Sequence, residues 1–409
     1  MVGYRNINLG EIGRTGLTWS AGSVYEEFLP ALSGSRGRKI YREMADNDAI
    51  VGAFLYAIEQ IIREVRWSVK PGDDKDAQSK KDAFFLQTCM NSMSHSWADL
   101  ITEILSMFTY GWALFEQVFE KKNGAIIWKK ISIRSQDSLE AWDLDENGGI
   151  KGMYQRTYPD FKLSYLPLSK CLLFRTKLNK DNPEGRSILR NSFRSFYFKK
   201  NIQEIEGIGI ERDLAGIPVL TAPDGFNIGS EKEEDQLAIA WAKDIITNVR
   251  NDEQAGLFLP HGWEFELLAS PGQKQFNTTE IINRYNKEIA VTVLAQFIML
   301  GMERTGSYAL AKEQTSMFYL ALDGWVNSIG SIFNRYAIPL LFGLNGQSFE
   351  VRPQPHIVHT IIGQPSLRDV ASYVSALANE KVNALVIDDE VRTYLKNYAK
   401  LREFSDVTL

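Results

Sequence analysis

The feature that most constrains this fold is a long charged segment that has the pattern of one helix. Residues 186–213 contain no proline, and about 28 residues of α-helix span roughly 42 Å. Their charges have both signs and alternate with aromatic residues and isoleucines, so no wide apolar stripe forms. The segment "IERDLAGIPVL", residues 210–220, then turns at Gly216 and continues through Pro218 as extended chain. A helix of this kind needs partners along its flanks.

A second long helix returns after a small acidic module. Asn277 and Glu280 have the spacing of a capping pair at the start of a helix over 276–300. The first half of this helix is polar and its second half, "AVTVLAQFIML", is apolar, which predicts passage from a solvated region into a core. Residues 214–275 predict a β-α-β-β unit that is too small to hold a large core alone. Its helix is expected to open with a Ser230–Glu233 capping box, and its last two strands are "AGLFLP" and "WEFELLAS".

The segments on either side predict an α+β body with an antiparallel sheet. Residues 1–40 are expected to be an extended arm, followed by a helix that Asp46 or Asn47 caps. Further predicted elements are a strand at Trp67–Val69, helices at 76–93 and 96–110, hairpins that turn at Asn123–Gly124 and at 147–149, and a strand in "SKCLLFRT".

The loop "GMERTGS", residues 301–307, separates the returning helix from a helical pattern of almost forty residues. Gly324 and Gly330 inside this pattern are expected to mark kinks. A strand in "SFEVRPQP" and a helical region over 365–409 complete the expected fold.

Composition and motifs argue against several classes of function. A net charge of −5 does not favour electrostatic wrapping of nucleic acid. Cys89 and Cys171 lie in apolar surroundings and are expected to be buried free thiols. The N-terminal residues lack the apolar core of a signal peptide, and the longest apolar run, about 14 residues, is too short to span a bilayer. No membrane partner is therefore expected.

No pattern of residues supports catalysis. His356 and His359 are three residues apart, but the nearby prolines predict extended chain and no acidic or cysteine ligand lies close in sequence. Phosphate-binding glycine motifs and a serine nucleophile motif are absent from the sequence. Tryptophans such as Trp67, Trp97 and Trp112 have the pattern of core residues. We therefore expect no catalytic residue, no metal and no cofactor, and a protein that is not an enzyme.

The order of these parts resembles the portal proteins of tailed bacteriophages, in particular those of Mu-like and related long-tailed phages. Three stretches carry the resemblance in the right order, namely "DNDAIVGAFLYAIEQIIREVRWSVKP", "GRSILRNSFRSFYFKKNIQEIEGIGIERDLAGIPVL" and "IAVTVLAQFIMLGMERTGSYALAKEQTSMF". The resemblance implies a portal fold with these parts: an N-terminal arm (1–40), a wing (41–185 and 308–364), a stem of two helices (186–213 and 276–300), a clip (214–275), a tunnel loop (301–307) and a crown (365–409).

The resemblance also implies a function. Portal proteins form a ring, usually of twelve copies, at one vertex of the capsid, and double-stranded DNA passes through the ring during packaging and ejection. The implied partners are the large terminase, the major capsid or scaffolding protein and a head-completion adaptor, with assembly in the host cytoplasm and a final location in the virion. Two alternatives stay open at this point: another head-assembly component, such as an adaptor or minor head protein, and an unrecognised soluble enzyme.

Three sets of residues follow from the resemblance. The tunnel loop places six residues nearest the DNA, and one arginine offset by one glutamate suits a sliding contact. The first turn of the clip helix presents acids for the motor and the adaptor. Charges on the outgoing stem helix are expected to face neighbouring subunits. The sets are Met302, Glu303, Arg304, Thr305, Gly306 and Ser307 for DNA; Glu231, Glu233, Glu234 and Asp235 for docking; and Arg190, Arg194, Lys199, Lys200, Glu204 and Glu206 for subunit contacts.

Overall fold

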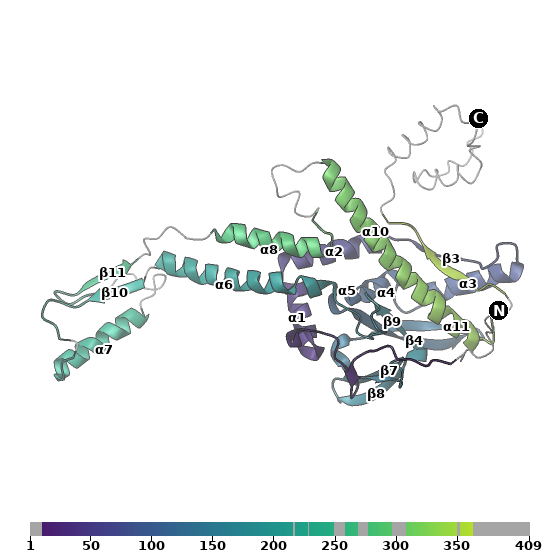
Figure 1. Cartoon of the computed structure of the whole chain (residues 1–409), viewed down its shortest axis with the longest axis horizontal. Coiled ribbons are helices and arrows are strands. Elements are labelled where there is room, and N and C mark those ends of the chain that lie inside the picture. The colour runs from purple at the N-terminus through teal and green to yellow at the C-terminus, as the bar shows by residue number, and fades with distance from the viewer. Residues whose placement is uncertain are drawn as a thin grey trace, which may run out of the picture.

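The chain consists of a body from which a pair of helices extends to a small distal module (Figure 1). This computed structural model describes residues 10–215, 217–227, 229–248, 258–268, 277–296, 308–349 and 352–362. The helix pair is α6 (Phe193–Ala215) and α8 (Thr278–Thr292). The distal module comprises β10 (Ile217–Thr221), α7 (Glu233–Asn248) and β11 (Glu264–Leu268), with β10 and β11 paired antiparallel. The chain therefore runs out along one helix and back along another, as the sequence predicts.

The body combines helices with antiparallel sheets, which confirms the α+β class. One sheet has the order β5-β4-β9 and another the order β6-β7-β8, while β3 pairs with β12 and β1 with β2. The helices are α1 (Gly34–Asn47), α2 (Ala49–Arg63), α3 (Ala77–Asn91), α4 (Trp97–Ile104), α5 (Ser106–Tyr110), α10 (Tyr308–Ile332) and α11 (Ile338–Leu344). The strands are β1 (Trp19–Ser20), β2 (Ser23–Val24), β3 (Trp67–Lys70), β4 (Trp112–Lys122), β5 (Ala125–Arg134), β6 (Leu139–Leu144), β7 (Ile150–Thr157), β8 (Lys162–Pro167), β9 (Cys171–Arg175) and β12 (His356–His359). Short 3-10 turns occupy Pro30–Leu32, Gln136–Ser138, Leu168–Lys170 and Ile188–Asn191 (η5).

Both predicted hairpins form. Asn123 and Gly124 have φ values of 53° and 84°, the left-handed pair that a tight turn between β4 and β5 requires. The Asn147–Gly149 turn joins β6 to β7. Strand β8 was not predicted, because four of its six residues are exposed and no apolar alternation marks it. Gly111, with φ 96°, ends α5 where a Cβ would lie 2.5 Å from the Glu184 carbonyl oxygen, so the close approach of these segments needs glycine.

Two apolar clusters hold the body together. The larger lies among α1–α5, α10, α11 and the sheet β5-β4-β9, and its fully buried aromatics include Phe54, Phe108, Trp128 and Phe333. The smaller lies beneath the sheet β6-β7-β8 around Trp112 and Trp142, whose ring centroids are 5.0 Å apart. Trp112 is a core residue as predicted, whereas Trp67 and Trp97 are half-buried at the edge of the larger cluster.

The two cysteines divide between these clusters as free buried thiols, which confirms that prediction. Burial raises the pKa of Cys89 to about 12 and that of Cys171 to about 12. Both thiols are therefore protonated at neutral pH and poorly nucleophilic.

The long helix after residue 308 departs from regular geometry at a different place than predicted. Gly324 and Gly330 lie inside the continuous helix α10, and the departure is a π-helical turn at Phe333–Ala337. Pro339 explains its position, since proline has no N–H to donate and its ring clashes with the carbonyl four residues before it, that of Arg335, inside this turn. The carbonyl of Asn334, which is not bonded as in a regular helix, accepts a hydrogen bond from Gln354 Nε2 at 2.8 Å.

Several predicted boundaries were wrong for identifiable reasons. Helix α1 begins at Gly34, inside the segment expected to be an extended arm. Asp48, not Asp46 or Asn47, caps α2 through its carboxylate. The predicted helix at 96–110 is interrupted at Leu105, between α4 and α5. Among the described residues, the last strand is β12. The described part of "SFEVRPQP" (348–349 and 352–355) is not strand, because Pro353 and Pro355 cannot donate to a ladder, whereas His356–His359 pairs with β3.

The predictions for the returning helix and the distal module also need correction. Asn277 does cap α8, but this helix ends at Thr292 and Leu294 has a φ of 60°. In the distal module, Ser230 Oγ accepts from the amide of Lys232, and α7 begins only at Glu233, so the expected capping box does not form. Residues 258–260 are not strand, and the rest of the predicted strand at 255–260 lies outside the described residues, as do 301–307 and 365–409.

Candidate functional site

The helix pair is held together by a ladder of polar contacts. Going outward from the body, Ser195 Oγ donates to Glu288 Oε2 at 2.6 Å, and Lys199 Nζ donates to Asn286 Oδ1 at 3.0 Å. Farther out, Thr278 Oγ1 donates to the Glu206 carboxylate. The partners run in opposite directions along α6 and α8, so the two helices are antiparallel neighbours. These polar contacts recur at helical intervals along the face of α6 that meets α8, where an apolar stripe is usual.

Three ion pairs join the start of the helix pair to the body. Arg190 Nη2 lies 2.6 Å from Glu27 Oε1, and Lys200 Nζ lies 2.5 Å from Glu43 Oε1. Hydrogen bonding to Glu43 raises the pKa of Lys200. Burial acts to raise the pKa of Glu27, but hydrogen bonds from Arg190 and from the Leu29 amide, together with the charges of Arg190 and Arg186, outweigh it, so the pKa is lowered. Both pairs are partly exposed to solvent.

The third ion pair is buried. Lys199 Nζ lies 2.5 Å from Asp48 Oδ2, and the two side chains are 5% and 0% exposed. Asp48 Oδ1 also accepts from the amides of Ile50 and Val51 at the start of α2, at 3.0 and 3.2 Å. One ammonium group thus connects α2, α6 and, through Asn286, α8.

The face of α6 opposite the polar ladder carries exposed apolar side chains. Tyr197 is 51% exposed, Ile205 68% and Ile208 50%, and their spacing of eight and three residues places them on one side of the helix. Phe198 borders this face, 40% exposed, with its ring 6.4 Å from that of Tyr285 on α8. We call Tyr197, Phe198, Ile205 and Ile208 the outer stripe.

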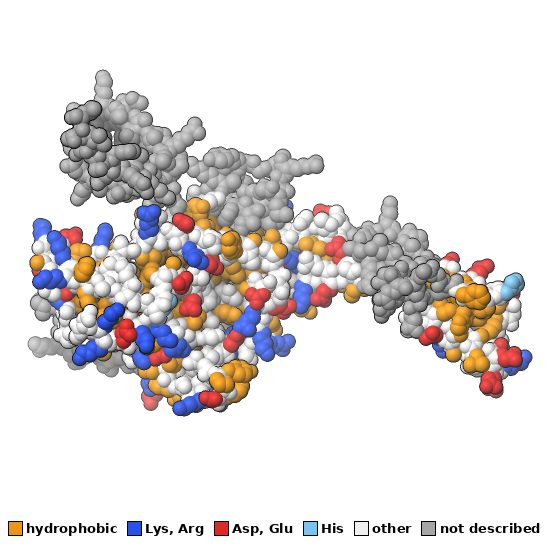
Figure 2. Space-filling view, turned by 180° about the vertical axis from the view of Figure 1, so that it is seen from behind, with side chains coloured by type: hydrophobic (Ala, Val, Ile, Leu, Met, Phe, Trp, Pro, Cys, Tyr) orange, Lys and Arg blue, Asp and Glu red, His pale blue; other side chains and the backbone are white. Residues whose placement is uncertain are grey.

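The distal module combines a small aromatic core with an acidic surface. The Trp263 ring lies 5.3 Å from that of Phe226 and 5.5 Å from that of Trp241. Glu233 and Glu234 are exposed in the first turn of α7, and Leu237 and Phe258 are 66% and 90% exposed. Figure 2 shows apolar and acidic side chains together on this end of the molecule. Such a mixed surface fits a protein partner.

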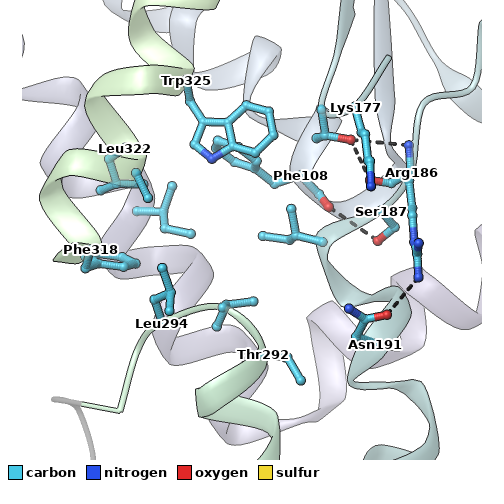
Figure 3. Close-up of a pocket in the computed structure, with 15 residues that line it drawn as sticks. Phe108, Lys177, Arg186, Ser187, Asn191, Thr292, Leu294, Phe318, Leu322 and Trp325 are labelled. Carbon is cyan, nitrogen blue, oxygen red and sulfur yellow. Dashed lines mark hydrogen bonds between the residues drawn. The ribbon is translucent and has the colours of Figure 1, made fainter. Parts of the chain in front are cut away.

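A cavity of about 360 Å³ lies beside the place where the helix pair meets the body. Figure 3 shows an apolar wall, mainly from α10, that faces a polar wall from the segment leading into α6. Arg186 Nη2 in the polar wall donates to Asn191 Oδ1 at 2.8 Å. The cavity is lined by Ile58, Phe108, Thr176, Lys177, Arg186, Ser187, Ile188, Asn191, Thr292, Val293, Leu294, Phe318, Ala321, Leu322 and Trp325.

Within the described residues, no group of three His, Cys, Asp or Glu side chains is placed to hold a metal ion. His359 Nε2 instead lies 3.1 Å from Asn327 Oδ1, and its ring packs 5.3 Å from that of Trp67. None of the helices that the structure describes is both long and apolar enough to cross a membrane.

Comparison with known proteins identifies the family. A family model described as the portal protein of Mu bacteriophage matches residues 38–394, which is most of the chain. The chain belongs to this family. Members of the portal family are structural proteins of the phage capsid, so the arrangement of helix pair and distal module belongs to a portal protein.

Solved structures show the same fold. A chain in the neck of an empty gene transfer agent (GTA) particle computed with C6 symmetry is 12% identical, with a TM-score of 0.57 over 87% of this chain and 93% of that one. A chain in the neck of the native GTA particle computed with C12 symmetry is 13% identical, with a TM-score of 0.56 over 88% and 93%. The virion of the native GTA particle contains a further similar chain, at 12% identity, TM-score 0.55 and coverages of 87% and 92%.

The predicted site residues of this portal protein are only partly among the residues that the structure describes. The loop residues Met302–Ser307 lie outside the described residues. Glu231 lies in the turn before α7, and Glu233, Glu234 and Asp235 lie together in its first turn, where carboxylates suit the helix dipole.

The charged residues predicted to contact neighbouring subunits differ in their exposure and in their contacts. Lys199 is buried within the chain, and Arg190, Lys200 and Glu206 each contact another segment of the same chain. Arg194 is exposed and lies over the Phe198 ring, 5.8 Å from its centroid, and Glu204 is exposed 4.0 Å from Lys200. Sequence reasoning missed the outer stripe, although its spacing is visible once the charged residues are left aside.

Proposed function

We propose that this portal protein forms a ring at one capsid vertex, through which double-stranded DNA is packaged into the capsid and later ejected. Family membership supports the role, and the C6 and C12 symmetry of the similar GTA necks supports a ring. In this proposal the body is the wing, α6 and α8 are the stem, the distal module is the clip, and residues 365–409 form the crown. Twelve copies is the number we expect.

The observation that carries the proposal is the outer stripe. Exposed Ile205 and Ile208 lie on a helix that already has its own partner, α8, on the opposite face. Removing each apolar square ångström from water is worth about 25 cal/mol, so an adjacent copy gains by covering this face. Arg194 and Glu204 flank the stripe, and the exposed parts of Arg190, Lys200 and Glu206 can add polar contacts to the same neighbour. A ring needs such repeated, heterologous contacts.

The test compares Ile205→Glu/Ile208→Glu with Phe84→Glu, a matched change at an apolar residue of α3 that is 76% exposed. Light scattering on a sizing column and negative-stain images measure the mass and shape of each purified protein. We expect rings with a central hole for wild type and Phe84→Glu, and smaller species with unchanged circular dichroism for the stem variant. Intact rings from the stem variant would remove the outer stripe from the interface.

We further propose that Met302, Glu303, Arg304, Thr305, Gly306 and Ser307 form the DNA-nearest loop of the channel. Support comes from the sequence, in which two glycines bound a short segment with one arginine and one glutamate. Replacing residues 302–305 by Gly and Ser should lower the packaged DNA per capsid while rings still assemble. Normal packaging by that variant would exclude a channel role for the loop.

The distal module is proposed to dock the terminase motor and then a head-completion adaptor. The acids at 231 and 233–235 beside exposed Leu237 support a dock with both charged and apolar contacts. Reversal of Glu233, Glu234 and Asp235 to lysine should weaken motor binding most at low salt, whereas Leu237→Ser should weaken it at all salt concentrations. Binding that ignores both changes would place the dock elsewhere. The proposal needs no cofactor, metal or membrane, and assembly would take place in the host cytoplasm with capsid or scaffolding protein.

A further inference from the structure

We infer that Asp48, Lys199 and Asn286 form a buried polar lock that sets the direction in which the helix pair leaves the body. The three residues come from the α1–α2 junction, α6 and α8, and a single ammonium group joins them. The inference concerns contacts within one chain, so it stands or falls independently of the proposed ring.

The lock lies at the boundary where the helix pair leaves the core. Among the described side chains of α6, Phe196 and Lys199 are buried, and none is buried from Lys200 to Gly209. On α8, Ile289 and Ala290 are buried, while no side chain from Asn277 to Glu288 is. Up to Gly209, where the described side chains of α6 end, Lys199 is therefore the last buried one. A small rotation of the helix pair at this point produces a large displacement of the distal module.

Asp48 is a fixed point of the body. Its backbone N–H closes α1 by donating to the Met44 carbonyl, and its Oδ1 accepts the first amides of α2. The carboxylate therefore has little freedom to follow a moving lysine. Lys199 must reach Oδ2 of this held carboxylate and Asn286 Oδ1 at the same time, which few orientations of α6 and α8 allow.

Close packing does not fix the direction of the helix pair on the side toward α10. The 360 Å³ cavity lies there, between α10 and the segments that carry Thr292 at the end of α8 and Asn191 in η5, just before α6 (Figure 3). An interior without voids resists displacement, whereas an open cavity gives room for it. The buried ion pair thus supplies a constraint that packing on the cavity side does not.

The chemistry of buried pairs agrees with a positioning role. Taking two charges out of water costs about as much as their attraction returns, so such pairs contribute little net stability, but few geometries satisfy them. The adjacent pair Lys200–Glu43 has side chains 43% and 37% exposed and is solvated in many geometries. These two neighbouring pairs provide a test and its control within one turn of helix.

The experiment measures the spread of distances between spin labels on the helix pair and on the body. Cysteines introduced as Gly207→Cys in α6, where a Cβ meets no atom within 4 Å, and Lys130→Cys in β5 carry the labels. Cys89 and Cys171 are buried and react poorly, so they can stay. Labelled chains are diluted with an excess of unlabelled chains, so that each measured distance lies within one chain.

Four proteins are compared by pulsed electron paramagnetic resonance. Asp48→Asn/Lys199→Met removes both charges, keeps a capping oxygen at residue 48 and leaves no unpaired charge, so we expect it to fold with a melting temperature near wild type. Its distance distribution should be at least twice as broad as that of wild type. Lys199→Met alone should broaden the distribution and also lower the melting temperature, because the buried carboxyl group of Asp48 loses its partner. Glu43→Gln/Lys200→Met should match wild type.

Two results would overturn the inference. A wild-type width in the Asp48→Asn/Lys199→Met protein would show that apolar packing alone sets the direction. Equal broadening in the Glu43→Gln/Lys200→Met control would show that the loss of any charge where the helix pair joins the body makes the direction of the helix pair less fixed. If the double variant does not fold, Asn286→Ala, which removes the third member and no charge, should still broaden the distribution, and a wild-type width there would equally reject the lock.

Discussion

Helices α2 and α6 differ in the side chains that they bury. In α2, Val51, Phe54, Ile58 and Ile62 form a complete buried face, each at most 3% exposed. In α6, the apolar residues of the outer stripe are 40–68% exposed, and Lys199 is the last buried side chain among those described, up to Gly209. The body is therefore stabilised by its own chain, whereas the helix pair has polar contacts inside and an apolar face outside. This difference is what a subunit needs if it folds first and assembles afterwards.

The largest expected effect is a loss of unfolding free energy when a buried aromatic residue of the body is replaced, compared with the same change at an apolar residue of the outer stripe. Phe333 is fully buried, with its ring 4.7 Å from that of Trp97 and 5.5 Å from that of Phe174. Phe333→Ala should lower the free energy of unfolding by about 3–5 kcal/mol. Ile205→Ala should change it by no more than about 0.5 kcal/mol in the unassembled chain. Denaturant unfolding measures both changes in free energy. Similar values for the two variants would contradict the expected difference between the body and the outer stripe.

A smaller effect is expected where the π-helical turn holds strand β12. Asn334 Nδ2 donates to the Ile357 carbonyl at 3.0 Å, and its Oδ1 accepts from the Ile357 amide at 2.7 Å. Asn334→Ala leaves both backbone groups of Ile357 without this partner and should cost about 1–3 kcal/mol of unfolding free energy.

Asn201→Ala on α6 is the matched control. The described part of the chain shows no hydrogen bond from the Asn201 side chain, so the change should leave the melting temperature almost unaltered. Equal losses of stability in the two variants would mean that the two hydrogen bonds between Asn334 and Ile357 do not stabilise the fold.

Helix starts provide a third, weaker contrast between the body and the distal module. Ser96 Oγ accepts from the Asp99 amide at 3.1 Å and forms a reciprocal capping box at the start of α4. Ser96→Ala should cost about 1 kcal/mol. Ser230→Ala should cost only a few tenths of this, about 0.2 kcal/mol, because Ser230 bonds only a turn amide before α7. Thermal unfolding followed by circular dichroism measures the loss of stability in each variant. Similar losses for Ser96→Ala and Ser230→Ala would contradict the expected difference between the two helix starts.

The smallest expected effect depends on pH and is confined to the body. Burial raises the pKa of Glu184, although the charge of Arg38 and a hydrogen bond from Trp142 Nε1 partly oppose this. A carboxyl whose folded pKa is raised contributes its full stability when protonated, below its ordinary pKa, and loses it as the pH rises through the folded value.

Glu184→Gln stays neutral and can still accept from Trp142, so it should raise the melting temperature at about pH 8 and lose this advantage near about pH 4. Melting curves across this range test the sign. An advantage that grew toward acid pH would show that Glu184 is stabilised as an anion. No change in the helix pair is expected, since Glu184 lies in the body.

Much of the element order was predictable because local signals were strong. The Asn123–Gly124 turn, the buried stripe of α2, the cap at Asn277 and the break after Ala215 depend on residues close together in sequence. The acids of α7 were visible for the same reason. Strand β12 was predicted at the wrong residues because its partner β3 is almost three hundred residues away in sequence. Strand β8 was missed because most of its residues are exposed, so that no alternation of apolar and polar residues marks it.

The sequence by itself determined that this chain has a helix running out, an acidic module and a helix running back, since periodicity, capping residues and glycine breaks are local properties. The tertiary structure alone decided what each charge on that helix does. Lys199 and Lys200 are adjacent and chemically identical in sequence, but one is buried against Asp48 and the other is half in solvent beside Glu43. Burial depends on which segments meet in space, and so does the cost of placing a charge there.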